Sequence, residues 1–243
     1  MLIVNADDLG RSREETNATL ACYSRGRVSS TSAMVFMADS TRAADLAADA
    51  RIPTGLHLNL SERFTAPGVP AELRASHDRL CGFLRMNKYA LIVYNPLLVR
   101  DFATAVSAQF DEFRRLYGRD PAHIDGHQHM HLATNVLWQG LLPAGVRVRR
   151  SFSFAKGKKS ALNRWYRARV DAALARRHAT VDFFYSLTSC LGDTSLSGVL
   201  AAARTSTVEL MVHAAWPREF EFLMSDDFEP LRTCMSECTR ASG

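Results

Sequence analysis

Apolar and polar positions alternate along the chain with two different periods, which predict strands and helices in turn. Residues 1–6 form an apolar run of strand length that ends in polar residues. Residues 55–60 alternate strictly, which places His57 and Asn59 on the face opposite three leucines. Residues 101–117 repeat apolar side chains at three- and four-residue steps, as an amphipathic helix does. Similar patterns predict helices at 14–25, 43–50 and 160–177 and a β-rich segment at 28–37.

This alternation of strand and helix signals favours a mainly parallel sheet with crossover helices. The predicted fold class is α/β, with the sheet closed as a barrel or left open, in a single domain that spans residues 1–243. Two stretches, near 61–94 and 147–178, break the alternation. Long excursions in a compact domain are typical of lids and binding loops, so we expect both insertions to determine the substrate.

The overall composition is that of an ordinary globular protein. Hydrophobic residues make up 47% of the 243 positions and charged residues 23%, which argues against a disordered tail or a coiled coil. The five cysteines are an odd number without a disulfide-framework spacing, which favours a reducing, cytoplasmic location. The chain starts without a basic leader region, and no apolar stretch reaches the roughly 20 residues that span a bilayer. We therefore expect no transmembrane helix.

The net charge of +5 is unevenly distributed, because residues 147–178 hold eleven Lys or Arg and a single acid, Asp171. A solvated basic face is one interpretation. Another interpretation is that the stretch contacts an anionic glycan, a sugar phosphate or a lipid-linked sugar at a membrane surface. In the last case the protein would bind peripherally to the membrane. Nucleic-acid binding is disfavoured, because the rest of the chain is net acidic and no recognition motif is present.

Asp7 and Asp8 are adjacent carboxylates at the end of the first predicted strand. Buried carboxylates need partners or a metal, although Asp is also a favoured helix N-cap. Consecutive strand residues face opposite ways, so one acid can ligate a metal while its neighbour has another function.

Residues 123–131 contain four histidines and an aspartate at alternate positions. In a strand all five would share one face, and imidazole is the commonest metal ligand, so this segment predicts a metal site. Several ligand sets stay open. His129 and His131 could chelate as a pair, whereas His123 or His131 could support the site without touching the ion. A catalytic metal usually takes three protein ligands and leaves a position for water.

Two further histidines lie on apolar segments. A lone His57 is more often a half-buried strand residue than a ligand, but parallel strands that end near Asp8, His57 and His127 would meet at one rim of the sheet. His213 ends the apolar segment 209–213 and could donate a proton to a leaving group.

Taken in order, the segments 5–10, 55–60, 123–131 and 209–213 resemble the four signature segments of the YdjC-like carbohydrate deacetylase family. The resemblance covers roughly residues 1–216. It implies a (β/α) barrel-like fold, one divalent metal ion and removal of acetyl groups from N-acetylated sugars. By the same resemblance the metal ligands are Asp8, His57 and His127, the general base is Asp7 and the general acid is His213. The family usually has proline after that histidine, where this chain has Ala214.

The expected function is therefore metal-dependent deacetylation of an N-acetylated sugar. One form of this hypothesis has an anionic or lipid-linked sugar as the substrate. The sequence does not assign the residues that bind the substrate. The metal is magnesium or zinc: a mixed Asp and His shell suits zinc, nickel or iron, whereas magnesium prefers oxygen. A homodimer is also an open expectation. The alternatives are a metal-dependent hydrolase of another bond, such as a phosphoester, and, less favoured, a basic nucleic-acid-binding protein.

Overall fold

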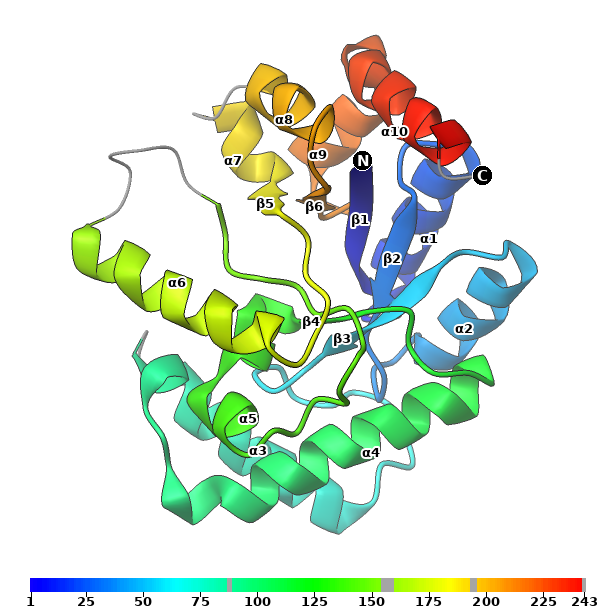
Figure 1. Cartoon of the computed structure of the whole chain (residues 1–243). Coiled ribbons are helices and arrows are strands. Elements are labelled where there is room, and N and C mark those ends of the chain that lie inside the picture. Colours follow the sequence, from blue (N-terminus) through cyan, green and yellow to red (C-terminus); the bar gives the residue numbers. More distant parts are fainter. Residues whose placement is uncertain (87–88, 154–159, 193–195, 242–243) are drawn as a thin grey trace. The chain divides into compact units, whose positions relative to one another are not determined.

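The computed structural model describes residues 1–86, 89–153, 160–192 and 196–241, whose strands and helices are labelled in Figure 1. The chain groups into two compact units built from interleaved segments. Unit 1 comprises Met1–Asp7, Asn17–Thr31 and Arg147–Gly243, and unit 2 comprises Asp8–Thr16 and Ser32–Val146. Three elements contribute residues to both units: β1 (Leu2–Leu9), α1 (Arg13–Ser24) and β2 (Ser30–Ala33).

The hydrogen-bonded strand order is β4-β3-β2-β1-β6-β5. Strand β6 is parallel to both of its neighbours, with Glu209 opposite Ile3 of β1 and opposite Phe184 of β5. Strand β3 is parallel to β4, with His57 opposite Asp125. Helices connect these strands along the chain, so the predicted α/β class with parallel strands and crossover helices is confirmed.

Unit 1 is formed largely by the C-terminal part of the chain. Alternate residues of β1 and β6, such as Val4 and Leu210, are buried in its apolar core with Phe228. Its other elements are α6 (Ala161–Ala175), β5 (Phe183–Ser186), α7 (Leu187–Gly192), α8 (Leu196–Ala203), β6 (Val208–Val212), α9 (Pro217–Met224), η4 (Asp226–Phe228) and α10 (Glu229–Ala241).

Unit 2 holds the middle of the chain. Its longest helix, α4, buries the apolar stripe predicted for 101–117, including Phe102 and Phe113, and ends at Gly118 in a left-handed conformation with φ of 64°. Its elements are α2 (Ser40–Asp49), β3 (Thr54–Leu58), α3 (Ala71–Arg85), η1 (Ala90–Ile92), η2 (Pro96–Leu98), α4 (Val99–Tyr117), β4 (Ile124–Gly126), η3 (His127–Leu132) and α5 (Thr134–Trp138).

Two predicted strands are shorter than expected. The β-rich segment 28–37 is a strand only in β2. The prediction that five residues of 123–131 share one strand face is wrong, because β4 ends at Gly126 and a 3-10 turn begins at His127. Gln128 and His129 take φ values of 52° and 61°, which are incompatible with a strand.

The helix predicted for 160–177 is confirmed as α6. Three lysines of the basic stretch, Lys156, Lys158 and Lys159, lie outside the described residues. Within the described part of the chain, no helix combines the length and apolar character that crossing a membrane requires. The single catalytic domain over 1–243, with insertions that determine the substrate, stays a prediction.

Candidate functional site

The three metal ligands that the family resemblance implies lie close together in unit 2. Oδ1 of Asp8 lies 3.2 Å from Nε2 of His57 and 3.0 Å from Nδ1 of His127. Each residue offers a ligand atom within 4.8 Å of the other two. Asp8 lies near the end of β1, His57 on β3 and His127 at the start of η3, so three parallel strands deliver the three side chains. The cluster can hold one cation.

Asp8 is fixed by both its backbone and its surroundings. Its φ of 67° is left-handed, a conformation that Asp tolerates better than most residues. Burial favours the neutral acid, but hydrogen bonds from His127 and His57 outweigh it and hold the pKa of Asp8 well below its ordinary value. Asp8 is therefore a carboxylate, the form that binds a cation. His127 also contacts Glu62, whose carboxylate accepts a hydrogen bond from Arg11.

A buried network orients His57 from behind. Its Nδ1 lies 2.8 Å from Oδ1 of Asp125, which leaves Nε2 directed at Asp8. Ser32 Oγ donates to Oδ2 of Asp125 at 2.5 Å and lies 3.1 Å from Nε2 of His123. Because a hydroxyl has one proton, His123 is the donor in the second contact. A carboxylate behind a ligating histidine fixes the ring's tautomer and orientation.

The other histidines of this segment occupy space left by glycines. A Cβ on Gly55 would lie 2.5 Å from the ring of His123, and a Cβ on Gly126 would lie 2.9 Å from His131. Both histidines are buried. His129 is partly exposed, and its ring centre lies 6.4 Å from that of His131. The geometry thus brings His127 to Asp8 and gives His123 and His131 packed positions behind the strands.

Asp7, the predicted base, lies in unit 1 in a buried ionic cluster. Arg149 binds it with two hydrogen bonds, from Nη1 to Oδ2 at 2.6 Å and from Nη2 to Oδ1 at 2.7 Å. Nδ2 of Asn5 donates to Oδ1 at 2.9 Å. Nε of Arg149 donates to Glu209 at 2.6 Å, and the guanidinium lies over the ring of Phe184. This cluster fixes the plane of the Asp7 carboxylate.

Arg149 and Glu209 are members of this cluster that the sequence analysis did not single out. Arg149 belongs to the basic stretch, yet its side chain is fully buried. A signal for such a residue was available, because acids within two apolar strands, at Asp7 and Glu209, require a buried cation. Composition does not say which of eleven basic residues supplies it.

His213, the predicted acid, follows β6 in unit 1 and is held by two neighbours. Its backbone N–H donates to Oε2 of the buried Glu219 at 2.6 Å. Its ring stacks on Trp216, with ring centres 4.2 Å apart and an angle of 11° between the planes. Thr188 donates to the same Glu219 carboxylate. The loop that lacks the family's proline is therefore ordered by Glu219 and Trp216, neither of which the sequence analysis singled out.

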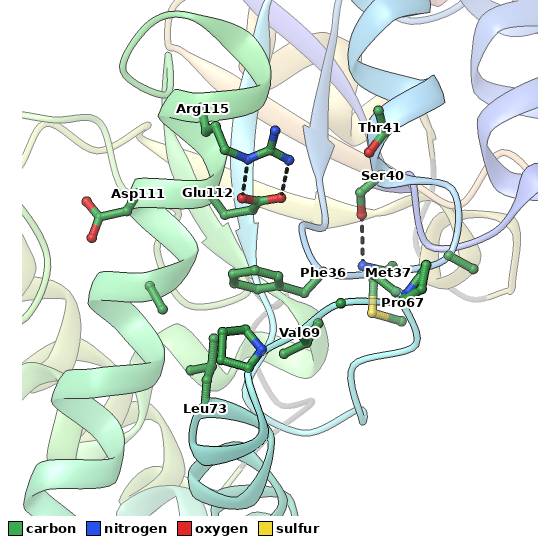
Figure 2. Close-up of a pocket in the computed structure, with 15 residues that line it drawn as sticks. Phe36, Met37, Ser40, Thr41, Pro67, Val69, Leu73, Asp111, Glu112 and Arg115 are labelled. Atoms are coloured by element: carbon green, nitrogen blue, oxygen red, sulfur yellow. Dashed lines mark hydrogen bonds and ion pairs between the residues drawn. The ribbon is translucent and has the colours of Figure 1, made fainter.

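A cavity of about 670 Å³ lies in unit 2 against the first part of the predicted 61–94 insertion. Figure 2 shows the Phe36 ring directed into it, with the Glu112–Arg115 ion pair on one side and Val69 on the other. Phe36 has a left-handed φ of 60°, and its carbonyl accepts the N–H groups of Thr65 and Ala66. The insertion thus holds a strained residue at a concave surface, a combination common at binding sites.

Comparisons with known proteins agree with the sequence motifs. A family model described as YdjC-like protein matches residues 1–236. A human protein named carbohydrate deacetylase is 32% identical over 246 residues, which cover 89% of this chain and 75% of its own length. A Yersinia pestis (strain Pestoides F) protein named chitooligosaccharide deacetylase is 31% identical over 137 residues, 56% of this chain and 52% of its own.

A solved structure supports the fold. A protein of Enterococcus faecalis V583, named as a candidate cellobiose-phosphate cleavage protein, matches with a TM-score of 0.63. The match covers 97% of this chain and 94% of that one at 18% identity, so it bears on the fold alone.

Proposed function

Because the chain belongs to the YdjC-like family, we propose that it is a carbohydrate deacetylase, a hydrolase that releases acetate from N-acetylated sugars. The convergence of Asp8, His57 and His127 on one point at the ends of three strands carries this proposal. The names of the human and Yersinia relatives support the same activity.

The cluster fits one divalent metal ion. It offers two imidazole nitrogens and a carboxylate, the three-ligand set that leaves a catalytic ion open to water. Asp125 behind His57 supplies the outer carboxylate that such sites use. Of zinc and magnesium, a set with two nitrogen donors favours zinc. When bound, the ion lowers the pKa of water and polarises the acetyl carbonyl.

Asp7 is proposed as the base that accepts a proton from the attacking water. Its assignment rests on the family motif and on its surroundings. Arg149 and Asn5 hold the carboxylate by three hydrogen bonds, so it is oriented before substrate arrives. Glu209 in turn holds the guanidinium of Arg149 through Nε.

His213 is proposed as the acid. The nitrogen of an amide leaves poorly as an anion, so the departing amine must be protonated as the carbon–nitrogen bond breaks. The backbone bond to Glu219 and the stacking on Trp216 restrict the direction in which the imidazole can present its proton.

Acetate release from a panel of N-acetylated mono- and oligosaccharides, with and without chelator, tests the proposal. Asp7→Asn is expected to retain metal, measured by elemental analysis, and to lose at least about 100-fold in kcat, as expected when a general base is removed. His127→Ala is expected to lose both metal and activity. His129→Ala is the matched control, because His129 lies two residues away and outside the cluster.

Full acetate release by metal-depleted Asp8→Ala protein would contradict the proposal. Phosphate release from phosphorylated sugars, without acetate release from N-acetylated ones, would assign the same cluster to phosphoester hydrolysis instead.

We further propose, from the sequence, that the protein is cytoplasmic and that its sugar substrate is anionic or lipid-linked. We also propose a homodimer, which a measurement of the molecular mass in solution tests: twice the mass of one chain is the expected result.

A further inference from the structure

Helix α6, in the middle of the basic stretch, presents most of its surface to solvent. Val170 and Leu174 are its buried side chains. On other sides of the helix, Leu162 is 74% exposed and Trp165 is 57% exposed. Leu162, Trp165 and Arg169 are spaced at three and four residues, so they follow one stripe along the helix. This stripe is apolar at its N-terminal end and basic further on.

The exposed surface of α6 has one sign of charge. Arg164 and Arg169 on the helix, and Arg176 and Arg177 just after it, are exposed, and the remaining exposed residues of α6 are alanines besides Leu162 and Trp165. The acid of the helix, Asp171, is partly buried and accepts hydrogen bonds from Arg150 and from the N–H of Ser151. Its charge is therefore compensated by the unit to which α6 belongs.

Trp165 and Arg169 also interact with each other. The guanidinium carbon of Arg169 lies 5.5 Å from the centre of the indole ring. An aromatic ring beside a cation suits the boundary between headgroups and acyl chains, where the ring is half desolvated while the cation meets phosphate. A helix that exposes apolar and basic side chains together is suited to bind an anionic lipid surface.

We propose that α6 is a membrane-surface helix that binds anionic phospholipid, with Leu162 and Trp165 among the headgroups and the exposed arginines at the phosphates. Charge complementarity carries the choice of partner, since four arginines are exposed on α6 and just after it, and none of the exposed residues of 160–177 is acidic. Leu162 and Trp165 favour lipid over nucleic acid as the partner. A nucleic-acid phosphate backbone would attract the arginines but would offer no apolar environment for an exposed leucine. The proposal is independent of the reaction at the metal cluster.

Co-sedimentation of the full chain with phosphatidylcholine vesicles, with and without phosphatidylglycerol, tests this inference. Binding is expected only with phosphatidylglycerol, and it should weaken as salt is raised. Arg169→Glu combined with Arg176→Glu should lower the partition coefficient at least about tenfold, because each arginine near an anionic surface adds roughly 1 kcal/mol. Arg51→Glu combined with Arg204→Glu changes net charge equally at exposed positions outside α6 and should retain most of the binding.

Tryptophan fluorescence tests the insertion. Anionic vesicles should shift emission to the blue, and Trp165→Phe should abolish the shift while Trp138→Phe preserves it. Equal binding to neutral vesicles, or equal losses in the two double variants, would overturn the proposal. The proposal would also be overturned if the protein bound a duplex oligonucleotide through α6 and did not bind anionic vesicles. Acetate release from a soluble sugar should be unchanged in the α6 variants, which separates this test from that of the proposed activity.

Discussion

Two glycines leave room for the buried histidines behind the candidate metal cluster. Gly55 precedes His57 by two residues on β3, and the ring of His123 lies where its Cβ would be. Gly126 gives the same room to His131. The position of the His57 ring, a proposed metal ligand, therefore depends on the absence of a Cβ at Gly55, because close-packed interiors transmit small displacements.

Gly55→Ala is expected to lower the free energy of unfolding by about 1–3 kcal/mol, the usual cost of overpacking a core. The His123 ring must move, and with it the Ser32 and Asp125 contacts that orient His57. The control is Gly82→Ala in α3, where a Cβ meets nothing within 4 Å and alanine adds roughly 0.5–1 kcal/mol through helix propensity. Urea denaturation in the presence of chelator measures the free energy of unfolding of both variants. Equal changes in Gly55→Ala and Gly82→Ala would contradict the packing argument.

Individual residues differ in how far sequence reveals them. Asp7 and Asp8 stand out because two acids end an apolar strand. Arg149 and Glu219 do not, because each partner is distant in sequence: Arg149 binds Asp7 across 142 positions, and Thr188 binds Glu219 across 31. Periodicity reports on neighbours within one element, whereas these contacts depend on how the elements pack.

At the scale of elements, the sequence predicts the regular parts best. The stripe of α4 and the strands β1 and β3 follow from the spacing of apolar residues, and Gly118 ends α4 as its conformational freedom allows. The segment after Ile124 could not be predicted in this way. Alternating histidines mimic a strand, but the backbone turns at Gln128 and His129, after His127 has reached Asp8.

Metal binding should tie together the ends of β1, β3 and the η3 turn. At an ion concentration about 100 times the Kd, binding stabilises the native state by about 2.7 kcal/mol. For a chain of this size that corresponds to a fall in Tm of about 5–10 °C when chelator removes the ion. Zinc should restore the Tm more fully than magnesium.

The variants make this test specific to the cluster. Asp8→Ala should remove the response of the Tm to chelator, and His129→Ala should retain it. An unchanged response in Asp8→Ala would show that the ion binds elsewhere.

For the whole molecule, the net charge of +5 conceals two different uses of one basic stretch. Arg149 is buried against Asp7 and Glu209, and Arg150 pairs with Asp171. Arg164 and Arg169 of α6, by contrast, are exposed to solvent. Charge counts along a sequence locate such a stretch, but burial decides which of its members act inside the protein.

The stability of the whole molecule should depend on His77, which is buried in unit 2. Its ring stacks on Phe64 at 3.6 Å and its Nε2 donates to the carbonyl of Asn59 at 2.9 Å. Burial lowers the pKa of His77 below its ordinary 6.5, despite the opposing effect of the Asn59 hydrogen bond. The native state therefore holds a neutral imidazole at pH values where the unfolded chain binds a proton.

The free energy of unfolding should consequently fall as the pH drops below about 6.5, by up to about 1.4 kcal/mol per pH unit until the lower native pKa is reached. His77→Gln preserves a donor to Asn59 but does not titrate, so the stability difference between wild type and variant should be constant above pH 6.5 and change in favour of the variant below it. Urea titrations in chelator measure this difference, and the other histidines cancel because both proteins carry them. Parallel pH profiles would contradict a neutral His77.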